Sequence, residues 1–436
     1  MTPTQARALV ALAGRLFLPL AWLARLPLAM GQIAVLLLVA ETTGSYGQGG
    51  LAAASLAVGS AVGGPVSGVL ADRFGQRVVL LVAGPVHAVG LLAVTLLAVR
   101  HATPAVLLAV AALAGAFVPQ VGPLVRVRWV ALVRREDSAA RQSVRLSEAF
   151  AYEGAADEAT FVAGPALVGV LATVAGPAVA PLVAAALALT TVTWFAVHWT
   201  VTLVQPQAGD VARRRATSQA SSGHRRGRLP GGADTAVLLP AALALGIIFG
   251  GTQAGVTAFA GELGRPGIAG IVYAVLGLGS ALAGLASAAL PPGFRLSSRL
   301  MAFGGALTLL SLPVLAAPSL SLLCVAVGLF GCAVAPFLIT VYALAERTVS
   351  LGRAASVLTL VASAIIVGYA VGSSTAGALG DGHGSRAAFV VPVAAATLAL
   401  LTSLGARGRM RRLESRRRVV TPEVPAEPRP APLDVR

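Results

Sequence analysis

The chain has 436 residues, of which 56% are hydrophobic and 11% are charged, and its formal net charge is +16. A water-soluble domain needs more polar surface than this composition supplies, whereas helices that face lipid are apolar on all sides. The composition therefore excludes an ordinary soluble protein and indicates a membrane protein. All 33 basic residues are arginines, and they alternate with apolar blocks, so we expect no nucleic-acid-binding face.

Twelve apolar blocks, each about long enough to span a bilayer, follow one another along the chain. The first six lie near 16–40, 50–71, 78–99, 104–127, 150–174 and 178–203. The second six lie near 235–259, 267–290, 299–317, 319–344, 354–379 and 387–405. The pattern predicts an all-α membrane protein of about twelve transmembrane helices, in two pseudo-symmetric six-helix halves over residues 1–203 and 235–406.

The arginines are divided unequally between the two sides of the predicted membrane. With an even number of spans both termini share one side, and the segments on that side hold 29 of the 33 arginines. The other side holds Arg100, Arg265 and Arg386, while Arg25 lies inside the first span. Because cytoplasmic loops carry the excess of basic residues, we expect a multi-pass protein of the inner cell membrane with both termini in the cytoplasm.

Two segments outside the spans have polar, basic compositions. Residues 204–234 contain arginines among Ser, Gly and Gln, and predict a flexible cytoplasmic linker between the halves. Residues 407–436 are basic and then rich in Pro and Glu, and predict a disordered cytoplasmic tail. Basic segments beside a membrane can also contact anionic lipid headgroups of the bilayer.

The loop between the second and third spans reads Gly68-Val-Leu-Ala-Asp72-Arg73-Phe-Gly75-Gln-Arg77. Gly68 permits close helix approach, Gly75 permits an unusual backbone turn, and Asp72 is a fixed anion at a helix end. The segment resembles the signature loop of the major facilitator superfamily, G-x-L-A-D-R-x-G-x-R, at its expected place. The resemblance implies that Asp72, Arg73 and Arg77 hold the halves together on the cytoplasmic side, with the anion near the positive end of a helix in the other half.

The fifth span contains Gly154, Gly164, Pro165 and Gly169, which partly resemble the Gly-Pro motif of exporters in the superfamily. The Gly164–Pro165 step would bend the helix, because proline removes one backbone donor. The partial match favours export, although ordinary helix packing explains the same residues almost as well.

Acidic residues occupy the fifth span although the internal repeat indicates that this helix can be apolar. A shift of 208 residues superposes glycines of the fifth span on glycines of the eleventh, and places Asp157 and Glu158 on Ile365 and Ile366. The acidic pair is therefore not required to build the helix. Ionisable residues inside a span are costly and usually face a cavity or a partner.

Glu153, Asp157 and Glu158 lie in the cytoplasmic third of this span, and Glu153 and Asp157 share one helix face at i, i+4. Two crowded carboxylates tend to retain a proton between them, which suits a proton carrier. Their candidate partners are Arg126 and Arg128 at the end of the fourth span and Arg25 in the first. The alternative is a set of static ion pairs at the membrane boundary.

Four other polar residues lie in the first, seventh, eighth and tenth spans, namely Gln32, Gln253, Tyr273 and Tyr342. Helices of these numbers line the central cavity in the superfamily, so the resemblance makes the four residues candidate substrate contacts. Alternatively, their side chains hold neighbouring helices together.

The resemblance and the carboxylates together predict a secondary active transporter that exports a small apolar or amphipathic compound in exchange for protons, by alternating access. A cavity lined mainly by Ala, Leu and Val suits such cargo better than a sugar. Uptake of a small nutrient uses the same fold and remains an alternative, and a non-transporting membrane sensor or assembly partner is a third. The sequence has no phosphate-binding loop with lysine and no metal-ligand spacing, so we expect neither an enzyme nor a cofactor.

Overall fold

The computed structural model describes residues 3–136, 138–204, 232–287, 289–291, 293–347 and 354–420. Within these ranges, twelve helices are long and apolar enough to cross a membrane. Each of the twelve predicted blocks coincides with one of these helices, which differ from the predictions mainly at their ends. The prediction of an all-helical protein with twelve spans is therefore confirmed.

The N-terminal half contains six spans and a short helix before them. Its elements are α1 (Pro3–Ala13), α2 (Phe17–Leu23), α3 (Leu26–Thr43), α4 (Tyr46–Phe74), α5 (Gln76–Val99), α6 (Pro104–Ala116), α7 (Val121–Val133), α8 (Ala139–Ala175), α9 (Val179–Leu187), the π-helical turn η1 (Ala188–Val192), α10 (Thr193–Val197) and the 3₁₀ helix η2 (Trp199–Val204). The first span consists of α2 and α3, the fourth of α6 and α7, and the sixth of α9, η1 and α10.

The C-terminal half contains the other six spans. Its elements are α12 (Gly232–Ala236), α13 (Leu239–Glu262), α14 (Ile268–Ser287), α15 (Leu296–Leu315), α16 (Leu320–Arg347), α17 (Ala354–His383) and α18 (Ser385–Val420). Most of the predicted linker, residues 205–231, lies outside the described residues.

The structure corrects the prediction of a disordered tail in part. Helix α18 continues to Val420, so residues 407–420 are helical, while 421–436 lie outside the described residues. Ala406 and Met410 are buried beyond the last apolar block. Their burial continues the packed face of α18 past the point at which the average composition becomes polar.

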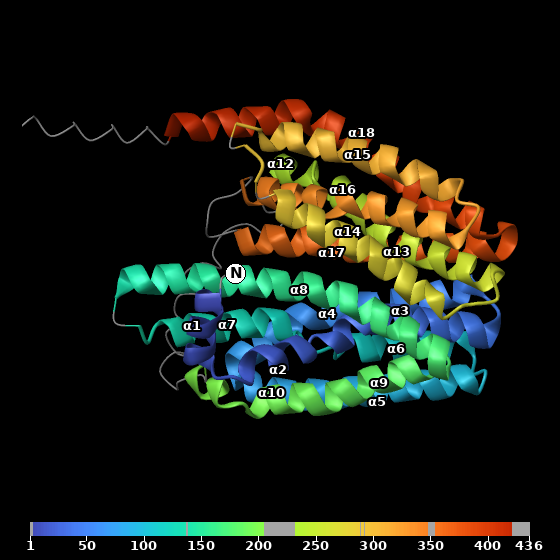
Figure 1. Cartoon of the computed structure of the whole chain (residues 1–436), viewed down its shortest axis with the longest axis horizontal. Coiled ribbons are helices and arrows are strands. Elements are labelled where there is room, and N and C mark those ends of the chain that lie inside the picture. Colours follow the sequence, from blue (N-terminus) through green and yellow to red (C-terminus); the bar gives the residue numbers. More distant parts are fainter. Residues whose placement is uncertain are drawn as a thin grey trace, which may run out of the picture.

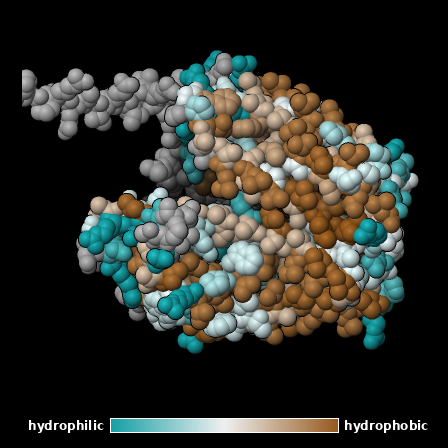
Figure 2. All heavy atoms as spheres, in the orientation of Figure 1, coloured by the Kyte–Doolittle hydropathy of each residue, from teal (hydrophilic) through white to brown (hydrophobic). Residues whose placement is uncertain are grey.

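The two halves are in contact at one end of the bundle and separate at the other. Figure 1 shows them as two groups of helices, with α8 and α4 of the first half beside α14 and α17 of the second. At the end that holds the loop at Ser45, which we call the closed end, the backbones touch: a Cβ added to Gly50 would lie 2.2 Å from the carbonyl oxygen of Ser373. Figure 2 shows a hollow between the halves at the opposite end, where α8 begins, which we call the open end.

Two spans are interrupted, which the sequence analysis did not predict. The first span is interrupted at Ala24 and Arg25, between α2 and α3. Pro27 follows in the first turn of α3. The fourth span breaks between Ala116 and Val121, and Pro119 lies in this gap. Proline cannot donate the helical hydrogen bond and disfavours helical geometry in the preceding residue, so both breaks have a local cause.

Candidate functional site

Four charged side chains form one cluster between the first, fourth and fifth spans. Arg25 forms an ion pair with Glu153, and its Nε lies 3.0 Å from Oδ1 of Asp157. Nη2 of Arg126 lies 2.6 Å from Oδ2 of the same Asp157. Asp157 therefore binds arginines from two different spans, one at each carboxylate oxygen. The structure thus brings together four of the six charged residues that the sequence analysis named for this cluster.

The helix interruptions place both arginines of the cluster. Arg25 is the residue that precedes α3, so its side chain leaves the first span at the break. Arg126 lies in the second turn of α7, just beyond the break in the fourth span. At Gly122, in the first turn of α7, a Cβ would lie 3.5 to 3.7 Å from the side chains of Asp157, Arg25 and Arg126. The start of α7 therefore forms one wall of the cluster.

Burial divides the cluster into a closed and an accessible part. Glu153 is 0% and Arg25 3% exposed, whereas Asp157 is 28% and Arg126 36% exposed. Glu153 also accepts a hydrogen bond of 2.7 Å from Nε1 of Trp129. The Arg25–Glu153 pair is consequently shielded from water, and Asp157 is the carboxylate of the cluster that a solvent proton can reach.

Glu158 and Arg128 lie outside this cluster. Glu158 follows Asp157 on α8 and is half-buried. Arg128 is fully buried, but it donates hydrogen bonds to Gln76, to the Phe195 carbonyl and to Thr200 rather than to a carboxylate. The expectation that Arg128 pairs with acids of the fifth span is therefore wrong. Instead, its guanidinium joins the start of α5 to the end of the sixth span.

His198, the first residue after the sixth span, packs against the ring of Phe17 with 5.6 Å between ring centroids. Burial lowers the pKa of His198, and the nearby Arg128 cation lowers it further. Both effects favour the neutral imidazole, whose Nδ1 lies 3.1 Å from the hydroxyl oxygen of Thr200.

The signature loop lies at the open end. Asp72 is in the last turns of α4, and Gly75, with φ +87°, joins α4 to α5 in a conformation that favours glycine. Asp72, Arg73 and Arg77 are all exposed. Among the described residues, no atom lies within 4 Å of a Cβ placed on Gly68, so the described helices of the other half do not pack against this position. The gating role of the loop applies to a conformation that is closed at this end. That role stays a prediction.

The four candidate substrate contacts differ in their surroundings. Gln253 is 3% exposed, and the hydroxyl of Tyr273 donates to the carbonyl of Phe249 at 3.4 Å. Gln32 and Tyr342 are half-buried. Their contact with a substrate stays a prediction.

Sequence analysis missed Tyr369 in the eleventh span. Its hydroxyl hydrogen-bonds to Oε1 of Gln253, and its ring packs in a buried cluster with Leu36, Ala53 and Ala57 of the other half. The Gln253–Tyr369 pair therefore lies at the interface between the halves. An isolated tyrosine in an apolar span gave no signal for this position, because the pairing depends on contacts between distant segments.

Gly164 and Pro165 lie within α8, which is uninterrupted from Ala139 to Ala175. A Cβ on Gly164 would lie 2.7 Å from that of Ala29, and a Cβ on Gly270 would lie 2.3 Å from the carbonyl oxygen of Pro165. Both residues therefore lie where α8 packs closely against α3 and α14. The bend predicted at this step stays a prediction.

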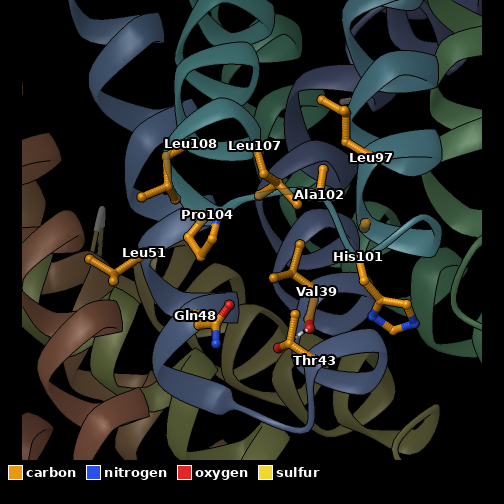
Figure 3. A pocket seen from close by; sticks show the side chains of 11 residues that line it. Val39, Thr43, Gln48, Leu51, Leu97, His101, Ala102, Pro104, Leu107 and Leu108 are labelled. Carbon is orange, nitrogen blue, oxygen red and sulfur yellow. Dashed lines mark hydrogen bonds between the residues drawn. The ribbon is translucent and has the colours of Figure 1, made fainter.

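A small cavity of about 30 Å³ lies at the closed end of the N-terminal half, away from the charged cluster. Apolar side chains line most of it, among them Val39, Leu97, Leu107 and Leu108 (Figure 3). It has room for about two water molecules, and no arginine or carboxylate lines it, so it lacks the chemistry of the cluster. Among the described residues, no group of three or more His, Cys, Asp or Glu side chains could hold a metal ion.

Comparison with known proteins identifies the class. A family model described as "Major Facilitator Superfamily" matches residues 17–295, which is more than half of the chain. The chain therefore belongs to the major facilitator superfamily of secondary transporters and is not an enzyme. No curated protein matches the chain closely enough to serve as a relative.

Solved structures of similar fold include the nucleoside transporter NupG, with 15% identity and a TM-score of 0.67 over 90% of this chain and 98% of that one. A peptide transporter POT in complex with sulfate has 12% identity and a TM-score of 0.63, over 91% and 94% of the two chains. A bacterial homologue of the iron transporter ferroportin, in its inward-facing state, has 16% identity and a TM-score of 0.63, over 90% and 99%. At these identities the similarity shows the fold alone.

Proposed function

We propose that this protein is a proton-coupled transporter in which Asp157 is the proton-binding group, and that it exports a small apolar or amphipathic compound in exchange for protons. One observation carries the proposal: a single, partly exposed carboxylate binds two arginines from two other spans. The internal repeat places Ile365 at the corresponding position, so the carboxylate is not needed to build the helix.

Protonation of Asp157 changes which helices are held together. The ionised carboxylate binds Arg126 of the fourth span and Arg25 of the first, and the four charges of the cluster sum to zero. A proton on Asp157 removes its charge and leaves Arg126 without its carboxylate partner, while Arg25 keeps Glu153. Arg126, which is 36% exposed, is then free to turn toward water. Proton binding thereby loosens the contact of the fourth span with the fifth.

The direction of transport is part of the proposal. With the arginine-rich side in the cytoplasm, the hollow at the open end faces the cytoplasm, and both termini lie there. In this inward-open arrangement, cargo enters the hollow from the cytoplasm, and Asp157 releases its proton to the same side. The close Gly164–Pro165 packing and the apolar composition favour export of amphipathic cargo.

Three further assignments belong to this proposal. Asp72, Arg73 and Arg77 close the cytoplasmic side when the halves approach each other there. Gln32, Gln253, Tyr273 and Tyr342 contact the substrate between the halves, and Glu158 assists proton entry. The basic segments contact anionic lipid of the bilayer, and no nucleic acid is involved.

Uptake of a small polar nutrient is the second candidate. The similar structures include transporters of nucleosides and of peptides, which are polar metabolites. The same cluster can couple to protons in either direction, because coupling depends on the order of binding rather than on the architecture. A deletion strain that loses growth on one nutrient, rather than resistance to one compound, would favour uptake.

The test is transport by purified protein in liposomes under an imposed proton gradient, with a panel of amphipathic compounds. We expect the Asp157→Asn variant to lose gradient-driven transport at least tenfold and to retain exchange of labelled for unlabelled substrate, which needs no proton movement. Glu148→Gln is the matched control, because Glu148 forms an ion pair of 2.8 Å with Arg145 on the same helix but outside the cluster. Gradient-driven transport that survives in Asp157→Asn would refute the role of Asp157.

A further inference from the structure

A carboxylate of one half binds the beginning of a helix in the other half at the closed end. Asp381, near the end of α17, accepts a hydrogen bond of 2.6 Å from the Ser45 hydroxyl. It also accepts backbone N–H bonds of 2.5 Å from Tyr46 and 2.9 Å from Gly47. These contacts join the eleventh span to the second, and they include the first two N–H groups of α4.

The start of α4 favours such an anion. The first N–H groups of a helix have no partner within it, and the helix dipole places partial positive charge there. The Ser45 hydroxyl satisfies only the N–H of Gln48, and the first turn of α4 contains no acidic residue. Asp381 therefore supplies from the other half the negative charge and the acceptors that the helix lacks in its own sequence.

The contact continues as close backbone packing. A Cβ on Gly377 would lie 2.4 Å from the carbonyl oxygen of Tyr46, and the Ser373 hydroxyl donates to the Gly50 carbonyl at 3.1 Å. The outer ends of α4 and α17 separate only if the bonds to Asp381 break.

The other end of the same helix pair has the complementary feature. Asp72 lies in the last turn of α4, at the open end. The two helices run antiparallel, since Gly47 packs against Ala378 and Gly50 packs against Ser373, so each helix has one carboxylate close to its own C-terminal end. At the closed end, the carboxylate of Asp381 is bound across the halves.

We propose that Asp381 is the positioning residue of the outer gate: its carboxylate on the start of α4 stabilises the conformation that is closed on the outer side. Because Asp381 is exposed, water competes for its bonds, so the contact is strong enough to bias the equilibrium and weak enough to be broken in each cycle. The inference goes beyond the proposed function, because it holds for either direction of transport and for any coupling ion.

The test measures the outer gate directly in the purified full-length protein and needs no substrate. Spin labels at His101→Cys and Arg265→Cys, in exposed outer loops of the two halves, report the outer gate in a background in which the two native cysteines are replaced by serine. We expect Asp381→Ala to increase the ratio of outer-open to outer-closed molecules about tenfold. We expect the addition of Asp72→Asn to return this ratio toward that of the parent protein.

Glu262→Ala is the matched control. Glu262 binds the start of α18 in the same way, through the N–H and the hydroxyl of Ser385, but both partners belong to the C-terminal half. The control should leave the outer distance distribution unchanged. An unchanged distribution in Asp381→Ala, in protein that remains monodisperse, would overturn the proposal, and so would an equal change in Glu262→Ala, because a general loosening of the loops would then explain both.

Discussion

At the scale of residues, the four members of the charged cluster have different roles because their burial differs. Glu153 and Arg25 are closed to water, and the nearby Trp129 completes the hydrogen bonding of the carboxylate. Asp157 and Arg126 remain partly exposed. A buried ion pair contributes little net stability compared with apolar residues, but removal of one partner leaves an unpaired charge. We therefore propose a structural role for the first pair and proton coupling for the second.

This division predicts a non-additive effect on stability. Arg25→Met alone should destabilise the protein by about 3–5 kcal/mol, because it leaves the buried Glu153 charge without its partner, whereas Glu153→Gln alone should cost less, because Arg25 keeps its ion pair with Asp157. The double variant should recover most of that loss, since glutamine still accepts the Trp129 hydrogen bond and no buried charge of this pair remains. Thermal unfolding of the detergent-solubilised variants measures the cycle. Strictly additive losses would show that the two side chains do not act as a pair.

At the scale of elements, glycines spaced four residues apart set the distances between helices. In α4, a Cβ on Gly59 would lie 1.9 Å from the Ala112 carbonyl oxygen, and one on Gly63 would lie 1.8 Å from that of Ala116. The same arrangement joins α13 to α17, where a Cβ on Gly246 would lie 1.9 Å from the Ile365 carbonyl oxygen. Small residues let membrane helices approach until their backbones touch, so the packing gains van der Waals contact that larger residues would prevent.

The contact distances predict opposite effects for the same substitution at two glycines. Gly63→Ala should reduce the yield of monodisperse protein and lower its unfolding temperature, because the methyl group has no space beside Ala116. Gly154→Ala should be neutral or stabilise α8 by about 0.5–1 kcal/mol, because no atom lies within 4 Å of its Cβ position and alanine restricts the unfolded chain. Size-exclusion profiles and thermal unfolding compare the two variants. Equal tolerance at both sites would contradict the packing argument.

At the scale of the whole molecule, the halves touch at one end and leave a hollow at the other (Figure 2). The closed end contains the Asp381 contact and the backbone packing of α4 on α17 and of α8 on α14. The open end contains the signature loop. The charged cluster lies nearer to this end than to the closed end. We therefore propose that the structure represents one extreme of an alternating-access cycle, and that it is the inward-open state if the arginine-rich side faces the cytoplasm.

This assignment predicts the sides of the membrane on which two exposed positions lie. His101→Cys, in the loop after α5, should react with a membrane-impermeant maleimide in intact cells. Val144→Cys, on the exposed surface of α8 at the open end, should react only after permeabilisation. The positive-inside rule is the reason, since the loops on the His101 side carry few arginines. The reverse pattern would place both termini outside and overturn the inward-open assignment.

Properties that depend on local composition follow from the amino-acid sequence alone. The length of the apolar blocks predicted all twelve spans, because a helix in lipid needs about 20 apolar residues wherever it lies in the fold. The signature loop from Gly68 to Arg77 pointed to the family, and the isoleucines opposite Asp157 and Glu158 in the repeat marked the acidic residues as unusual. Pro119 also carried a readable signal for the break in the fourth span, which the span prediction ignored.

Which charged side chains form pairs depends on the tertiary structure. The spacing of Arg126 and Arg128 made them equivalent candidates, yet one residue pairs with Asp157 and the other with Gln76, because they point to opposite sides of α7. The contact of Asp381 with Tyr46 spans more than 300 residues of sequence, and no local pattern specifies it. Side-chain partners between distant segments depend on how whole helices pack and rotate, so the chemistry of the cluster and of the outer gate exists only in the assembled bundle.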